Sequence, residues 1–179
     1  MIFRETGLAG AWLVEVEPHT DERGQFSRIW CRREFGERGL ATDLVQASLS
    51  WNRRRRILRG MHYQAAPFEE VKLVRCVRGA VHDVIIDLRP DSPSFLEHFA
   101  VDLTADNRRS VYVPEGFAHG FQVLDDGSEV LYHMSEFYSP DHGRGVRWDD
   151  PTFGIDWPIA DPILNERDRS YPDFRERKG

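Results

Sequence analysis

The chain has 179 residues, a hydrophobic fraction of 40% and a formal net charge of −6. This length allows one substantial domain, and the acidic balance argues against a nucleic-acid-binding protein. No apolar run approaches the roughly 20 residues that span a bilayer, and the first 24 residues lack the pattern of a signal peptide. Two cysteines, Cys31 and Cys76, are too few for a disulfide scaffold. We therefore expect a cytoplasmic protein that binds neither membrane nor nucleic acid.

Short β-rich runs separated by turn residues follow one another along the chain. Strand patterns occur in "AWLVEVEPH", "KLVRCVRGAVHDVIIDLRP", "SFLEHFAVDLTADN" and "RSVYVPEGFAHGFQVLDDGSEVLYHMSEFYSP". The helix candidates are short, and they lie near Arg33–Gly39 and Asp161–Arg169. Many short strands with evenly spaced turns are typical of a sandwich or closed barrel. The sequence predicts an all-β fold with short peripheral helices, as a single domain over residues 1–179.

Several strands carry polar side chains where alternation predicts buried positions. In "RGMHYQ", alternation places His62 on the face opposite to Arg59. A polar group on an inward face is costly unless it is paired, whereas a larger barrel can hold a ligand. The polar residues on separate strands therefore predict a pocket; they are His62, Lys72, Asp83, His119 and Tyr132.

Other polar residues are given their ordinary structural interpretation. The run "RRRR" at 53–56 is most simply a solvated loop, and the alternative is a nearby anionic ligand such as a phosphate. Single histidines in strands and turns are more often structural than catalytic, and we expect this of His19, His98, His133 and His142.

Longer motifs carry a more specific signal. They are, in order, "DERGQF" (21–26), "RGMHYQ" (59–64), "KLVRCVRGAVHDVIIDLRPDSPSF" (72–95), "VPEGFAHGF" (113–121), "EVLYHMSEFYSP" (129–140) and "WDDPTFGIDWP" (148–158). In order and spacing, the chain from about residue 2 to residue 174 resembles the dTDP-4-dehydrorhamnose 3,5-epimerase family. The resemblance implies a cupin-type jelly-roll barrel and an isomerase that epimerises a nucleotide-linked 4-keto-6-deoxyhexose at C3 and/or C5, in dTDP-rhamnose or related deoxysugar biosynthesis.

The resemblance also implies a site, an assembly and the absence of a metal or organic cofactor. The family's base matches His62, its orienting carboxylate matches Asp168, and its proton-donating tyrosine matches Tyr132. Lys72 joins them as the charge beside the developing oxyanion. The remaining substrate contacts match Arg23, Phe26, Gln46, Arg59, His119, Tyr138 and Arg167, the last where the family usually has lysine. The expected assembly is a homodimer in which N-terminal strands cross to the partner subunit.

Three positions depart from the family pattern. Arg28 and Gly143 stand where glutamate is usual, and Ser48 stands where asparagine is usual. All three family residues lie on the nucleotide side of the site. The nucleotide base of the substrate is therefore left open by the sequence.

Three alternatives remain at this point. A metal-dependent cupin enzyme would bind its ion through two histidines at H-x-H spacing, and here Gln64 stands in the second position, leaving His62, Glu70 and His119. A nucleotide-sugar 3,4-ketoisomerase, or an epimerase acting at one carbon only, would use the same enolate chemistry. A non-catalytic sugar-nucleotide binder would not need a base, an orienting carboxylate and an acid together.

Overall fold

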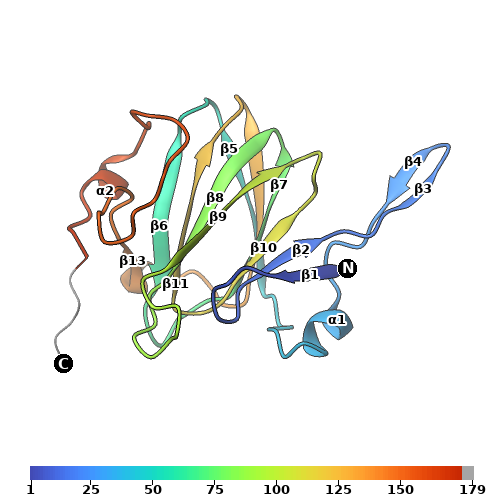
Figure 1. Ribbon diagram of the computed structural model, residues 1–179, viewed down its shortest axis with the longest axis horizontal. Coiled ribbons are helices and arrows are strands. Elements are labelled where there is room, and N and C mark those ends of the chain that lie inside the picture. The colour runs from blue at the N-terminus through green and yellow to red at the C-terminus, as the bar shows by residue number, and fades with distance from the viewer. Residues whose placement is uncertain (175–179) are drawn as a thin grey trace.

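Two antiparallel sheets packed face to face form the body of the protein in the computed structural model, which describes residues 1–174 (Figure 1). The last five residues of the predicted domain, 175–179, lie outside the described part. The six-stranded sheet has the order β1 (Ile2–Glu5), β2 (Trp12–Glu15), β10 (Ser110–Val113), β7 (Lys72–Arg78), β12 (Ser128–Met134), β5 (Gln46–Asn52). The five-stranded sheet has the order β13 (Gly143–Gly145), β6 (Leu58–Gln64), β11 (Phe117–Val123), β8 (Ala80–Asp87), β9 (His98–Thr104).

The remaining elements are small and lie outside the two sheets. A two-stranded hairpin, β3 (His19–Asp21) and β4 (Gly24–Phe26), projects away from the body at the upper right of Figure 1. The helices are α1 (Arg32–Gly36), the 3₁₀ turn η1 (Pro140–His142) and α2 (Glu166–Arg169). The all-β prediction is confirmed, and both predicted helices exist in shorter form. No helix of the described residues is long and apolar enough to cross a membrane.

The main core lies between the sheets because alternate residues of facing strands are apolar. It includes Val74, Ile85, Val111, Phe121 and Val130, each no more than 1% exposed. This dry core fills only part of the space between the sheets, and the rest is lined by polar residues of β5, β6, β7, β11 and β12. The inward-facing residues are thus apolar in one region of the sandwich, where they form the core, and polar in another, where they line a cavity.

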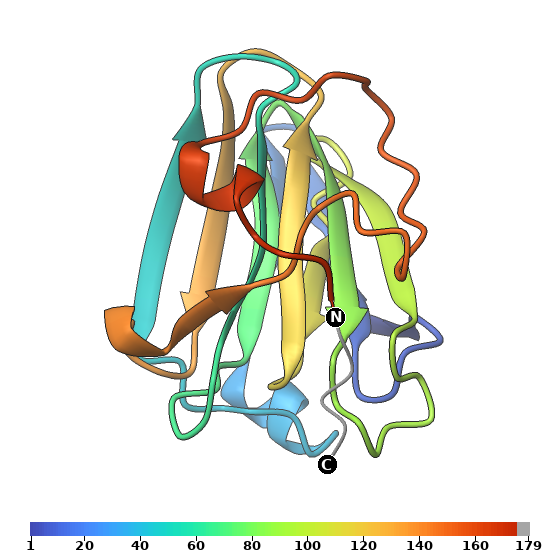
Figure 2. The same ribbon diagram turned by 90° about the vertical axis from the view of Figure 1, so that its left-hand side faces the viewer.

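The outer faces of the two sheets differ. The chain after β13 folds back over the five-stranded sheet and packs Val146 and Phe153 against Met61 and Ile86. Figure 2 shows this segment, which includes α2, lying across the sheet. The five-stranded sheet is therefore covered by apolar contacts on both faces, and the covering segment carries Asp168 to Gly60 and His62 of β6.

A bulge in β6 corrects one expectation about side-chain direction. Against β11, His62 pairs with His119 and Arg59 pairs with Phe121, so three steps along β6 match two along β11. The extra residue resets the alternation, and Arg59 and His62 both face the interior instead of opposite sides. Gly60 occupies the bulge with φ of +133°, and a Cβ there would lie 2.6 Å from the Cα of Gly120. Only glycine fits this close approach.

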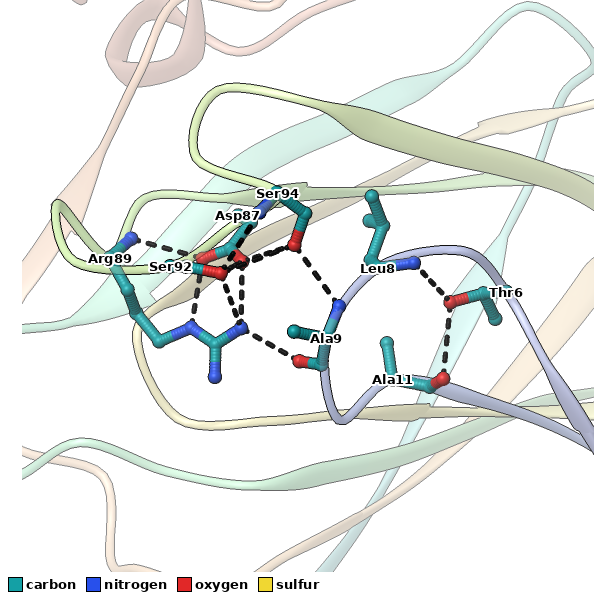
Figure 3. A network of polar contacts seen from close by, with 8 residues as sticks. All are labelled: Thr6, Leu8, Ala9, Ala11, Asp87, Arg89, Ser92 and Ser94. Atoms are coloured by element: carbon teal, nitrogen blue, oxygen red, sulfur yellow. Dashed lines mark hydrogen bonds and ion pairs between the residues drawn. The ribbon is translucent and has the colours of Figure 1, made fainter.

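A buried polar network fixes the N-terminal turn to the end of β8 (Figure 3). Asp87 is fully buried and accepts hydrogen bonds from Arg89 Nε at 2.8 Å and Ser94 Oγ at 2.7 Å. Arg89 also donates to the Ala9 carbonyl at 2.7 Å, and the Ala9 amide donates to Ser94 Oγ at 3.0 Å. These bonds satisfy the buried carboxylate and anchor the strands from which the hairpin departs.

Candidate active site

A cavity of about 460 Å³ opens between the sheets, which is the size of a small-molecule site. Side chains from both sheets line it. They are Gln46, Ser48, Arg59, His62, Glu70, Lys72, His119, Phe121, Tyr132, Met134 and Tyr138. Seven of these were predicted as site residues from the sequence: Gln46, Arg59, His62, Lys72, His119, Tyr132 and Tyr138. The polar pocket expected from strand alternation is therefore present.

His62 and Asp168 form a hydrogen-bonded pair at the wall of the cavity. Asp168 Oδ1 lies 2.6 Å from His62 Nε2, and the carboxylate is 1% exposed. Its Oδ2 accepts the Gly60 amide at 3.2 Å. An ionised carboxylate only accepts hydrogen bonds, so a neutral imidazole paired with one donates from Nε2 and leaves its lone pair on Nδ1. This arrangement orients an imidazole as a base.

The short helix α2 brings Asp168 into place. Asn165 is its N-cap, and the Asn165 side chain accepts the Asp168 amide at 2.7 Å. Asparagine is among the best residues for this capping role. The position of the carboxylate therefore depends on a local capping interaction as well as on its bond to His62.

Tyr132 enters the cavity from β12, on the sheet that faces His62. Its ring meets the His119 ring edge to face, with centroids 5.9 Å apart. Burial, followed by the nearby Asp83 carboxylate, raises the pKa of Tyr132 above its ordinary value of 10.0. The phenol therefore stays protonated at neutral pH and can donate a proton.

His119 has its own carboxylate partner, Asp83 on β8. His119 Nε2 lies 2.8 Å from Asp83 Oδ2, and the two residues are 4% and 1% exposed. The cavity thus contains two histidine–carboxylate pairs, His62 on β6 with Asp168 and His119 on β11 with Asp83.

Two cationic side chains in the cavity are held by neighbours. Lys72 Nζ lies 3.1 Å from Glu70 Oε1 and donates to the His62 carbonyl at 3.3 Å. Arg59 Nε donates to Asn52 Oδ1 at 2.8 Å. Asn52 is fully buried, and its amide nitrogen donates to the Ser50 and Ser128 carbonyls, so all its polar atoms are engaged. The cavity presents fixed positive charge to a ligand.

Three predicted substrate-binding residues do not line the cavity. Arg23 and Phe26 lie on the projecting hairpin, and Phe26 is 75% exposed. Arg167 lies at the rim, where its guanidinium occupies the space above Gly143 close to the Tyr138 hydroxyl. Within one protomer, Arg23 and Phe26 are not brought together with His62, whereas Arg167 adjoins the rim of its cavity.

The other positions singled out from the sequence fall into two groups. Ser48 lines the cavity and Gly143 adjoins Arg167, so both are near the site. Arg28 pairs with Glu34 at 3.2 Å, outside the cavity. The arginine run 53–56 lies in the β5–β6 loop and contributes nothing to the cavity lining, in keeping with a solvated loop.

Three residues that matter to this geometry were not predicted as site residues. Glu70 and Asn52 hold Lys72 and Arg59, and Tyr171 packs edge-on against His62 with ring centroids 6.3 Å apart. Tyr171 fits there because Gly145 leaves room for its ring. Strand alternation puts Glu70 on the same face as Lys72, because the two residues are two positions apart. This pattern could have identified Glu70 as a site residue. Nothing local to the sequence around Tyr171 indicated its contact.

Within residues 1–174, no three His, Cys, Asp or Glu side chains converge as a metal-ion site requires. Gln64, which stands where a metal cupin has its second histidine, is bonded to the Phe68 and Phe137 carbonyls and to the Ser139 amide.

The fold and the cavity define a class of protein: a cupin-type β-sandwich with an acid–base pocket between its sheets. The family model described as dTDP-4-dehydrorhamnose 3,5-epimerase matches residues 5–176. A protein of that description from Methanothermobacter thermautotrophicus is 43% identical over 177 residues, covering 97% of this chain and 95% of its own. The chain belongs to the dTDP-4-dehydrorhamnose 3,5-epimerase family and is an isomerase.

Solved structures agree with this assignment. The dTDP-4-dehydrorhamnose 3,5-epimerase from Elizabethkingia anophelis superimposes with a TM-score of 0.95 at 36% identity, covering 99% of this chain and 98% of its own. The enzyme from Bacillus anthracis, solved with TDP and PPi bound, gives a TM-score of 0.93 at 38% identity and covers 97% of this chain and 99% of its own. The jelly-roll architecture expected from the resemblance is confirmed.

Proposed function

We propose that this protein, acting as one domain, epimerises a dTDP-linked 4-keto-6-deoxyhexose at C3 and C5, as a step in dTDP-rhamnose or related deoxysugar biosynthesis. The observation that carries the proposal is the placement of His62, with its partner Asp168, and Tyr132 on facing sheets of one cavity. The thymidine form is supported by the relative solved with TDP and PPi bound. The free thiols of Cys31 and Cys76 are compatible with the cytoplasm, the compartment that we propose.

Epimerisation beside a ketone needs a base on one face of the sugar ring and an acid on the other. His62 Nδ1 takes the proton from the carbon next to the C4 carbonyl, and Asp168 stabilises the imidazolium that forms. The electron pair moves onto the carbonyl oxygen as an enolate. Tyr132 then donates its phenolic proton to the opposite face of the same carbon, and this inverts the centre.

The enolate and the diphosphate both need positive charge. Lys72 supplies a hydrogen bond to the developing oxyanion, with His119 beside it. Arg59 keeps its two terminal nitrogens for phosphate oxygens because Asn52 takes only Nε. Arg167 and Tyr138 at the rim, with Gln46 beneath, serve the nucleotide end of the ligand.

Solution NMR tests the reaction directly. The protein is incubated with dTDP-4-keto-6-deoxyglucose in heavy water, and the C3 and C5 proton signals are followed. Loss of both signals together with the appearance of the epimerised sugar is the expected result. Exchange at C3 alone would identify a single-carbon epimerase, and a keto group moved to C3 would identify a 3,4-ketoisomerase. No exchange at either carbon would refute the proposal.

Asp168→Asn is expected to lower kcat by about 10- to 10²-fold, a smaller loss than removal of His62, because it disturbs the orientation of the base and leaves the proton acceptor in place. The measurement is kcat with the same substrate, beside Asp91→Asn, which removes an exposed surface carboxylate, as the control. A loss equal to that of His62→Ala would show that Asp168 does more than orient the ring.

We further propose that the protein works as a homodimer and that each β3–β4 hairpin completes the cavity of the partner subunit. Two features support this. The outer face of the six-stranded sheet exposes Leu49 by 58%, Trp51 by 53% and Val77 by 40%, an apolar patch suited to a second copy. The hairpin carries Arg23 and Phe26 away from their own cavity (Figure 1).

A mixing experiment tests the exchange of hairpins. Arg23→Ala and His62→Ala proteins, each poorly active, are co-expressed with different tags. A heterodimer then contains one cavity with an intact His62 and an intact hairpin from the partner. Random pairing should restore about a quarter of the wild-type sites. Light scattering gives the mass of each sample. A dimer without restored activity would place Arg23 at its own cavity, and a monomer would refute the assembly.

A further inference from the structure

Glu70 is a carboxylate in the cavity wall that the mechanism above does not use. Its side chain is 11% exposed and lies 3.1 Å from Lys72 Nζ, which is equally shielded. A negative charge here opposes the negative charge of the developing enolate. We therefore expect Glu70 to make a favourable interaction that outweighs this repulsion. Among the described residues, its only ion pair is with Lys72.

The geometry around Lys72 suggests that role. An ammonium group has three N–H donors and no acceptor. The ammonium nitrogen lies 3.1 Å from Glu70 Oε1 as an ion pair, and one N–H donates to the His62 carbonyl at 3.3 Å. N–H donors therefore remain for a ligand in the cavity that Lys72 lines. The His62 carbonyl belongs to β6, so this hydrogen bond ties the ammonium to the strand that carries the proposed base.

We propose that Glu70 is a positioning residue, whose ion pair with Lys72 directs a free N–H of the ammonium at the carbonyl oxygen that becomes the enolate oxyanion. Without Glu70, the four-carbon side chain of Lys72 can adopt more rotamers. Its ammonium group is then less well aligned to stabilise the oxyanion in the transition state. The inference rests on the proposed function because it takes Lys72 to contact the oxyanion.

A double-mutant cycle separates this role from a direct contact with substrate. Glu70→Leu and Glu70→Gln are made in the wild type and in a Lys72→Met background, and kcat and KM are measured with the keto sugar. Glu70→Leu should lower kcat by about 10- to 10²-fold, since small misplacements of catalytic groups have effects of that size. Glu70→Gln should lose less, because its amide oxygen still accepts a hydrogen bond. In the Lys72→Met background, Glu70→Leu should change kcat by less than about twofold.

Binding and folding measurements complete the test. The Kd for dTDP, which has no sugar, should stay within about twofold in Glu70→Leu. Glu69→Leu, a change in the neighbouring carboxylate outside the cavity lining, serves as the control. Thermal unfolding identifies any variant that fails to fold, and Glu70→Gln, which has nearly the same shape, keeps the test valid in that case.

Three results would overturn the inference: an unchanged kcat in Glu70→Leu, a higher kcat, or the same loss in the Lys72→Met background. The last would show that Glu70 acts on the substrate without Lys72. Failure of the proposed function is distinct from these outcomes. It would appear as a lack of epimerisation in the wild type.

Discussion

Replacing His62 by alanine is expected to lower kcat by about 10²- to 10⁴-fold, the range that general acid–base groups supply. Among the two cavity histidines that pair with buried carboxylates, His62 is the one proposed as the base, and Asp168 holds its Nε2 at 2.6 Å. Its removal leaves Asp168 without its partner and leaves the carbon acid without a base. The measurement is the initial rate of epimerisation at saturating substrate, together with deuterium uptake from heavy water, and both should fall together.

The matched control is His98→Ala, which removes a histidine on β9, outside the cavity lining. It should retain wild-type kcat. The Kd for dTDP should also be nearly unchanged in His62→Ala, because the nucleotide contacts lie elsewhere in the cavity. Near-normal epimerisation by a folded His62→Ala protein would refute the assignment of the base.

Tyr132→Phe is expected to separate proton removal from inversion. Loss of the hydroxyl removes the acid on one face of the sugar, while His62 remains to take a proton from the other face. Epimerisation should fall by about 10²- to 10⁴-fold. Exchange of the substrate proton with solvent should fall much less, because His62 can return a deuteron to the face from which it took the proton. NMR of the sugar protons in heavy water reports both quantities in one sample.

The pH dependence offers a second measurement on the same residue. Burial, with Asp83, raises the pKa of Tyr132, so the phenol stays protonated beyond its ordinary value of 10.0. Wild-type activity should therefore show no loss from this group as the pH rises from 7 toward 10.

For Tyr132→Phe, the matched control is Tyr63→Phe, which lies outside the cavity lining. It should leave the rates of proton exchange and of epimerisation unchanged. Equal loss of exchange and epimerisation in Tyr132→Phe would mean that Tyr132 is needed for proton removal itself.

Strand alternation and ordered motifs were enough to predict the sandwich and the polar pocket. His62, Lys72, His119 and Tyr132 lie on inward faces of regular strands, and period-2 alternation carries that information. Asp168 was matched through the family resemblance, and its contact with His62 spans 106 residues of sequence, which no local pattern can encode.

Two features of the site could not be predicted from alternation. The bulge at Gly60 turns Arg59 to the same side as His62, and a bulge is set by the pairing of two strands that are far apart in sequence. The contact of Tyr171 with His62 depends on how the C-terminal segment folds over Gly145. Both depend on tertiary contacts that the sequence does not display locally.

The hairpin residues Arg23 and Phe26 were assigned by family resemblance alone, because within one protomer they do not contact the cavity. Arg23 and Phe26 extend into solvent, and Arg23 pairs only with its neighbour Asp21 among the described residues. A binding role for either residue depends on a second subunit. The mixing experiment therefore bears on the site as much as on the assembly.

In the proposed mechanism, an imidazole and a phenol act on one sugar carbon from opposite faces of the ring. A crystal structure of the protein with dTDP-glucose, which lacks the keto group and cannot react, would show this arrangement. We expect the pyranose to lie between the two sheets, with His62 Nδ1 against one face and the Tyr132 hydroxyl against the other. A sugar bound outside this cavity, or both groups on the same face of the ring, would contradict it.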